Sequence, residues 1–160
     1  MEIKLNDQEI KELILEKKQF PKEWHTIFQM KDKKGHKEKE IRIPRNDGSL
    51  LKIILRQNMI NPLDFSIILG YMTPKSSMLF RLIRYNGKSH QHTNKIEKHY
   101  FYDFHIHRAT VKYQESGFKE DGYAEITNSY SDINSAWDCF IKECNLVFPE
   151  DNQMSLFGKE

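Results

Sequence analysis

Histidines cluster in one short part of this sequence. Five of the seven, His90, His92, His99, His105 and His107, lie between positions 90 and 107, and four of them form two His-x-His pairs. Imidazole groups transfer protons near neutral pH and are common metal ligands. The cluster therefore predicts a functional site that uses one of these two kinds of chemistry.

The spacing of the second pair indicates how these side chains are arranged. We expect residues 99–113 to form one strand, in which alternate side chains share a face. One face would then carry His99, Phe101, Asp103, His105 and His107. The other would carry Tyr100, Tyr102, Phe104 and Ile106, and we expect it to face the core. The histidines of this strand are therefore predicted to point away from the core, beside a loop that carries His90 and His92.

Acid–base chemistry on a phosphodiester is the first interpretation of this arrangement. One histidine would remove the proton of a ribose 2′-hydroxyl and another would protonate the leaving oxygen. An arginine, Arg84 or Arg108, would stabilise the charge that develops on phosphate. Arg84 and Asn86 end the strand before the loop, so they are the better placed partners. The candidate catalytic residues are Arg84, Asn86, His90, His92, His105 and His107, the substrate class is RNA, and no cofactor is needed.

Two alternatives stay open. Imidazoles at positions i and i+2 of one strand can both reach a single divalent metal ion, so His105 and His107 with Asp103 form an alternative metal site, which His90 or His92 could also complete. The histidines could instead be structural and donate hydrogen bonds to backbone carbonyl groups.

The elements around the cluster are predicted from periodicity. Asn6 and Glu9 have the spacing of a capping box, so a helix of about 12 residues should follow. A short helix is expected within 21–30, and a last helix after the N-cap candidate Ser131. Between them, period-two patterns and turn residues predict strands near 38–44, 49–57, 64–72, 78–86, 99–113 and 122–128. The fold class is α+β: an N-terminal helix, a five- to six-stranded, mostly antiparallel meander sheet, and a C-terminal helix packed on one face.

Length and composition exclude several classes of protein. The chain has 160 residues, of which 38% are hydrophobic and 30% charged, which is enough for one domain, expected at 1–148 and followed by a flexible tail at 149–160. No apolar run approaches the roughly 20 residues of a membrane span. Neither a secretory signal nor a disulfide spacing is evident, so we expect a cytoplasmic protein with free Cys139 and Cys144. Motifs of P-loop nucleotide hydrolases, zinc ribbons, zincins and α/β-hydrolases are absent from the sequence.

The net charge of +2 conceals a segregation of charge along the chain. Residues 46–114 carry 10 Lys and Arg against 4 Asp and Glu, whereas residues 115–160 carry 3 against 10. A basic segment of this kind could contact RNA or DNA. It could equally be balanced inside the molecule by the acidic C-terminal part, which is the simpler interpretation.

Three segments carry a resemblance to known proteins. They are Arg84-Tyr85-Asn86-Gly87, the stretch from Ser89 to Asn94, and the stretch from Phe104 to Thr110. Together they resemble an uncharacterised family of small bacterial proteins, and the likeness extends from about Asn61 to the last helix. They are similar more loosely to His-rich toxins of bacterial toxin–antitoxin pairs, although the acidic residue that those toxins have at the strand end is missing here. The resemblance implies a bacterial or phage protein of defence, with a cognate antitoxin or host protein as partner.

The C-terminal residues carry a separate motif. Gln153-Met154-Ser155-Leu156-Phe157 resembles the peptide with which many bacterial replication and repair proteins bind the DNA sliding clamp. Leu156 and Phe157 would fill an apolar pocket, Met154 would cover its rim, and the Gln153 amide would fix the register. The alternative is that Leu156 and Phe157 fold back onto their own domain.

Overall fold

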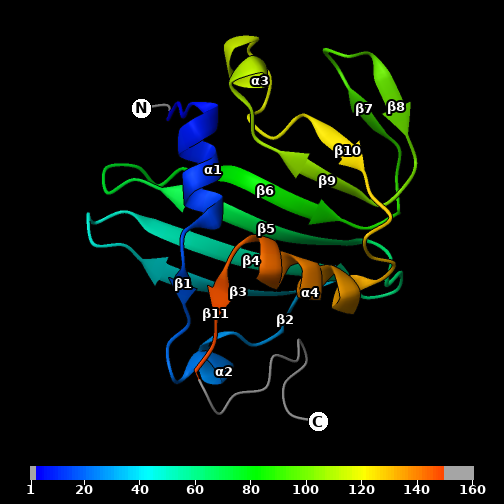
Figure 1. Ribbon diagram of the computed structural model, residues 1–160. Helices are drawn as coiled ribbons and strands as arrows, with labels where there is room; N and C mark the ends of the chain where they lie inside the picture. Colours follow the sequence, from blue (N-terminus) through cyan, green and yellow to red (C-terminus); the bar gives the residue numbers. More distant parts are fainter. Residues whose placement is uncertain (1–2, 150–160) are drawn as a thin grey trace.

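A computed structural model describes residues 3–149 as a mixed α/β fold around one large antiparallel sheet (Figure 1). The helices of these residues are α1 (Asp7–Leu15), α2 (Trp24–Ile27), α3 (Val111–Glu115) and α4 (Ile133–Glu143). The strands are β1 (Lys18–Gln19), β2 (Lys31–Lys33), β3 (His36–Pro44), β4 (Leu50–Asn58), β5 (Phe65–Met72), β6 (Phe80–Asn86), β7 (His92–Asn94), β8 (His99–Phe101), β9 (His105–Arg108), β10 (Ala124–Ile126) and β11 (Leu146–Val147).

The main sheet has seven strands in the order β10-β9-β6-β5-β4-β3-β2, and every neighbouring pair is antiparallel. The mixed α/β class and the antiparallel sheet predicted from the sequence are thereby confirmed. The sheet has seven strands instead of five or six, because Lys31–Lys33 pairs with β3 at one edge.

The single strand expected at 99–113 is wrong. The chain forms β8 at 99–101, turns, re-enters the main sheet as β9 at 105–108, and continues into α3 at 111–115. β8 pairs with β7 in a separate two-stranded sheet, while β9 lies between β6 and β10. The alternation of side chains therefore does not run unbroken from His99 to His107.

Local sequence explains where the two longer helices begin. Asn6 caps α1 in the predicted capping box, in which its side chain accepts a hydrogen bond from the Glu9 amide and the Glu9 carboxylate accepts one from the Asn6 amide. The N-cap of α4 is Asp132, not Ser131, and its carboxylate accepts a hydrogen bond from the Ser135 amide at 2.8 Å. The ionised carboxylate is the stronger partner for the first-turn amides, which explains the difference of one residue.

Helices α1 and α4 lie across one face of the sheet (Figure 1) and bury its apolar side chains. Trp137 and Phe140 of α4 are fully buried there, and Phe140 contacts the Tyr85 ring edge-on at 5.4 Å. On β9, only Ile106 between the two histidines belongs to this core cluster. His105 and His107 therefore project from the opposite face, as their parity predicts.

A second layer covers that opposite face where β9 lies. The β7–β8 hairpin, at the upper right of Figure 1, packs against the side chains of this face and buries Phe101 to 7% exposure against the rings of His92 and His105. The Asn94 side chain joins the hairpin to β10, because its amide donates to the Ala124 carbonyl at 2.7 Å and its oxygen accepts from the Ala124 amide at 2.8 Å. His105 and His107 therefore point away from the helix-covered core as expected, but the hairpin buries them to 0% and 4% exposure.

The turn after β6 requires glycine. A Cβ atom at Gly87 would lie 1.9 Å from the Leu63 carbonyl oxygen, so no larger residue fits without a shift of the backbone. The Gly87 amide donates to the Phe65 carbonyl at 2.9 Å. This close approach fixes the end of β6, where Asn86 lies, against the start of β5.

The segregated charges meet inside the molecule. Arg108, from the basic middle of the chain, forms ion pairs with Glu125 at 2.7 Å and Glu143 at 2.6 Å. Arg81 and Arg84 both contact the carboxylate of Asp121. Three arginines of the basic segment thus pair with carboxylates of the acidic C-terminal part, in line with the simpler interpretation of the sequence.

Cys139 and Cys144 are both free thiols, as predicted. Among residues 3–149, none of the helices has the length and apolar character needed to cross a membrane.

Candidate metal centre

Strands β6 and β9 bring four of the predicted site residues onto one face of the sheet. Asn86 is the direct antiparallel partner of His105, and Arg84 is the partner of His107. Directly opposite residues of an antiparallel pair project from the same face. The Tyr130 hydroxyl lies 2.8 Å from the Asn86 carbonyl and 3.0 Å from the His105 carbonyl, so it holds the two strands together at this point.

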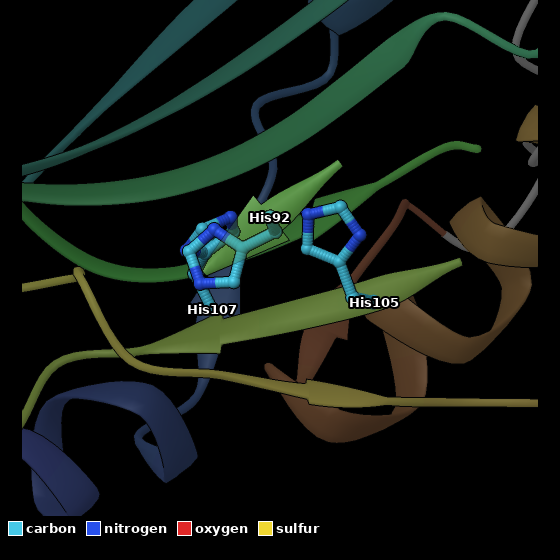
Figure 2. Close-up of side chains that lie close together, drawn as sticks. All are labelled: His92, His105 and His107. Atoms are coloured by element: carbon cyan, nitrogen blue, oxygen red, sulfur yellow. The ribbon is translucent and has the colours of Figure 1, made fainter. Parts of the chain in front are cut away.

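The β7–β8 hairpin adds His92 to this group. The His92 ring lies with its centroid 4.7 Å from that of His107 and 5.4 Å from that of His105. One ring nitrogen from each of these three histidines lies within 4.8 Å of one from each of the others. Figure 2 shows His105 and His107 projecting from the same strand toward His92, which comes from a separate one. The three imidazoles therefore converge from two strands that belong to different sheets, β7 and β9.

Hydrogen bonds fix which nitrogen of the two β9 histidines carries the proton. The Nδ1 atom of His105 lies 2.7 Å from the Asp103 carbonyl oxygen, and that of His107 lies 2.8 Å from the Asp121 carbonyl oxygen. A carbonyl oxygen only accepts, so both Nδ1 atoms are donors. In the neutral ring Nε2 then keeps its lone pair.

The side-chain amide of Asn94 orients His92, and two hydrogen bonds to Ala124 fix the orientation of that amide. Asn94 bonds the Ala124 backbone through both its oxygen and its nitrogen, so its oxygen is the atom that faces His92 Nε2 at 2.8 Å. His92 Nε2 is therefore a donor, and its Nδ1 keeps the lone pair. Each of the three rings thus has one nitrogen bound to a fixed oxygen. The other nitrogen of His105, Nε2, lies 3.5 Å from the Asn86 side-chain nitrogen, a weak contact that a metal ion would replace.

Burial keeps all three rings neutral. It lowers the pKa of His105 to about 4 and, with a further contribution from the positive charge of Arg84, the pKa of His107 to about 2. The pKa of His92 is lowered as well, mainly by burial. A neutral imidazole is the form that binds metals, so no proton has to leave before these rings act as ligands.

A pocket of about 370 Å³ borders the histidine cluster. His92 and His107 form part of its wall, whereas His105 is fully buried behind them. The other lining residues are Arg84, Asn86, His90, Gln91, Thr93, Lys95, Tyr113, Phe118, Lys119, Asp121 and Gly122. A metal ion held by the three rings would therefore be close to an open space large enough for a small ligand.

Not every predicted residue belongs to the cluster. His90 is exposed at the pocket wall, with its ring centroid 6.0 Å from that of His105. His99 is exposed on β8, because the strand that was to align it with His105 is interrupted. Of the residues named for the alternative metal site, His105 and His107 lie together with His92, whereas Asp103 contributes its backbone carbonyl, which orients His105.

Sequence reasoning missed the residues that orient the histidines. Asn94 stands two positions after His92, which is a spacing that could have suggested an orienting partner. Asp121 had no comparable signal, since it lies 14 residues after His107 and contributes its backbone carbonyl. The predicted clamp-binding residues Gln153, Met154, Leu156 and Phe157 lie outside the residues that the structure describes.

In comparisons with known proteins, no family model, curated protein or solved structure matches this chain.

Proposed function

We propose that this protein binds a divalent transition-metal ion, with Zn²⁺ as the first candidate, through His92, His105 and His107. The observation that carries the proposal is the pattern of hydrogen bonds behind the three rings. Histidines that bind metals almost always donate their other ring N–H to a carbonyl, carboxylate or water, which fixes the tautomer. All three rings of the cluster follow this pattern.

Three protein ligands beside a pocket are typical of catalytic zinc sites, in which a water or substrate takes the fourth position. In structural zinc sites the protein provides all four ligands. Zn–N bonds of about 2.0–2.1 Å require ligand nitrogens closer together than 4.8 Å, so the rings must approach one another on binding. His92 is the ring best able to move, because it is only partly buried and its strand has three residues.

The same observations count against acid–base chemistry by His105 and His107. A general acid near neutral pH must carry a proton, and the pKa values of about 4 and about 2 leave both rings neutral there. Burial also separates His105 from any substrate in the pocket. RNA as a substrate or ligand remains compatible with the proposal, but the metal centre would provide its chemistry.

Metal analysis of the purified chain tests the proposal. We expect close to one equivalent of Zn²⁺ per chain after incubation with the ion and removal of the excess, because the site has three neutral nitrogen ligands. His92→Gln should lose the bound metal, and this substitution lies on a partly exposed strand, so the fold should persist. Co²⁺ in place of Zn²⁺ should give the visible absorption of a tetrahedral, nitrogen-bound ion.

The exposed His25 on α2 provides the matched control. His25→Gln should leave the metal content unchanged, since this residue is no part of the cluster. A metal content below about 0.1 equivalent in the unmodified protein would refute the proposal. Equal metal contents in the His92 and His25 variants would refute the assignment of His92 as a ligand.

The clamp motif supports a second, independent proposal, that Gln153, Met154, Leu156 and Phe157 bind the bacterial DNA sliding clamp. Short peptides of this kind bind weakly because ordering them costs entropy, and we expect a dissociation constant on the order of micromolar. Titration of a purified clamp with the full chain measures it. The double variant Leu156→Ala/Phe157→Ala should abolish binding, and unchanged binding would refute the proposal.

A further inference from the structure

The pocket beside the histidine cluster is positively charged. Arg84, Lys95 and Lys119 line it, against a single lining carboxylate, that of Asp121. Its lining side chains therefore carry a net charge of plus two with neutral histidines, and a divalent metal ion would raise this further. A cleft lined by one sign of charge favours ligands of the opposite sign, so the pocket suits an anion.

Asp121 does not neutralise this pocket, because two arginines share it. Its carboxylate is 1% exposed and lies 3.2 Å from Arg81 Nε and 3.3 Å from Arg84 Nε. The three side chains together keep one positive charge. Asp121 thus fixes the Arg84 guanidinium at the pocket wall, next to its cross-strand partner His107.

One wall of the pocket is aromatic. Phe118 is 39% exposed, although a phenylalanine ring is usually buried, and it lies in the loop after α3. Its ring contacts that of Tyr113 at 5.8 Å, and Lys95 Nζ lies 5.6 Å from its centroid. An exposed ring beside lysines is typical of sites where a nucleic-acid base stacks while cations hold the phosphate.

We propose that this pocket binds a nucleotide, with its phosphate group between Arg84 and the histidine-bound metal and its base against Phe118. The inference rests on the proposed metal site for the position of the phosphate. Lys95 and Lys119, both exposed, attract the anion at the rim. The nucleotide is either a free one or one residue of single-stranded RNA, since both present the same phosphate and base.

Calorimetric titration of the Zn²⁺-loaded full chain tests this inference, with metal content measured on the same sample. The probes are inorganic phosphate, ribose 5-phosphate, adenosine 5′-monophosphate and an adenosine octaribonucleotide. Adenosine 5′-monophosphate should bind about tenfold more tightly than ribose 5-phosphate, because only the nucleotide has a base to stack. Phe118→Ala should remove this difference and leave the affinity for ribose 5-phosphate unchanged.

Two double variants test whether the lysines of the pocket, and not the overall charge of the chain, attract the nucleotide. Lys95→Met/Lys119→Met should weaken binding of adenosine 5′-monophosphate about tenfold at low salt and reduce the salt dependence. The control Lys22→Met/Lys34→Met removes the same charge at exposed positions outside the pocket and should change neither. All four lysines are exposed, so the fold should be retained.

The outcomes distinguish this inference from the proposed function. Full zinc content without nucleotide binding at millimolar concentration, or equal weakening by both double variants, overturns the nucleotide site and leaves the metal site standing. Failure to retain zinc overturns the metal site, and with it the placement of the phosphate. Tighter binding of the octaribonucleotide than of the mononucleotide supports RNA as the source, and equal binding supports a free nucleotide.

Discussion

The three histidines are alike in sequence, yet each is oriented by a different kind of partner. His105 donates to a carbonyl two residues away, His107 to a carbonyl in a later loop, and His92 to a side-chain amide. The first partner is local and follows from the turn before β9. The other two exist only in the folded chain, so the sequence identifies the cluster but not the hydrogen bonds that make it a set of ligands.

Asn94 provides the most specific test of this orientation. Asn94→Ala removes the acceptor of His92 Nε2, and partners of this kind typically contribute 10- to 100-fold to metal affinity. We therefore expect the dissociation constant for Zn²⁺ to rise by about that factor. Competition with a chromophoric chelator measures it.

Asn94→Asp is the matched variant for this test. It keeps an oxygen that accepts from His92 and from the Ala124 amide. Its second oxygen replaces the donor to the Ala124 carbonyl and repels that carbonyl, so the substitution weakens the link to β10 but keeps the acceptor for His92. The affinity for Zn²⁺ should therefore lie much closer to that of the unmodified chain. An alanine variant that binds as tightly as the unmodified chain would show that Asn94 does not orient a ligand.

At the scale of elements, the sequence predicts what periodicity and turns encode. The strands near 38–44, 49–57 and 64–72 correspond to β3, β4 and β5, because alternating apolar residues and turns such as Asn46-Asp47-Gly48 are local signals. The break between β8 and β9 has no such signal. Apart from Phe101, residues 99–107 alternate in type, and the pairing of β8 with β7 decides where the strand ends.

Burial of the site could not be predicted for the same reason. His105 and His107 have the parity of a surface strand, and only the folding of the β7–β8 hairpin over β9 removes them from water. That contact depends on Phe101, which packs against His105 across a turn, and on Asn94, which bonds Ala124 30 residues later in the chain. A sequence pattern reports which face a residue takes, but not what covers that face.

The start of α4 gives a prediction at this scale. Asp132→Ala removes the N-cap, and loss of such a cap costs about 1 kcal/mol of folding free energy. Hydrogen bonds from Ser135 lower the pKa of Asp132 below its ordinary value of 3.8. A carboxylate with a lower pKa in the folded state stabilises the fold above its unfolded pKa and loses this effect as the pH falls through the folded pKa.

The variant should therefore be less stable at pH 7, and the difference should shrink below pH 3.8. Urea unfolding at a series of pH values measures both. Asp138→Ala, at an exposed position within the same helix, should leave stability nearly unchanged. Equal unfolding free energies of the unmodified chain and the Asp132 variant at pH 7 would contradict a capping role.

At the scale of the whole molecule, the metal ion would join two layers. His105 and His107 belong to the main sheet, whereas His92 belongs to the hairpin that covers it. Opening of the hairpin would detach His92 and release much of the metal-binding free energy. Metal binding should therefore stabilise the hairpin against local opening as well as the whole chain against unfolding.

The size of this effect follows from mass action. A free Zn²⁺ concentration of 100 times the dissociation constant stabilises the bound form by about 2.7 kcal/mol, which corresponds to roughly 100-fold slower hydrogen exchange of amides that require hairpin opening. Amides of β7 and β8 should show this slowing when metal-loaded and chelator-treated proteins are compared. Amides that exchange by fraying at the ends of α1 should not, because that opening leaves the three histidines in place.

The pattern of exchange distinguishes two kinds of metal site. If zinc is bound and the hairpin amides exchange as fast as in the metal-free protein, the ion is held by His105 and His107 on β9 alone, and His92 is no ligand. If hairpin and core strands are slowed together while α1 is not, the ion joins both layers. The second result is expected, because His92 is the third histidine of the cluster and its strand is fixed to β10 through Asn94.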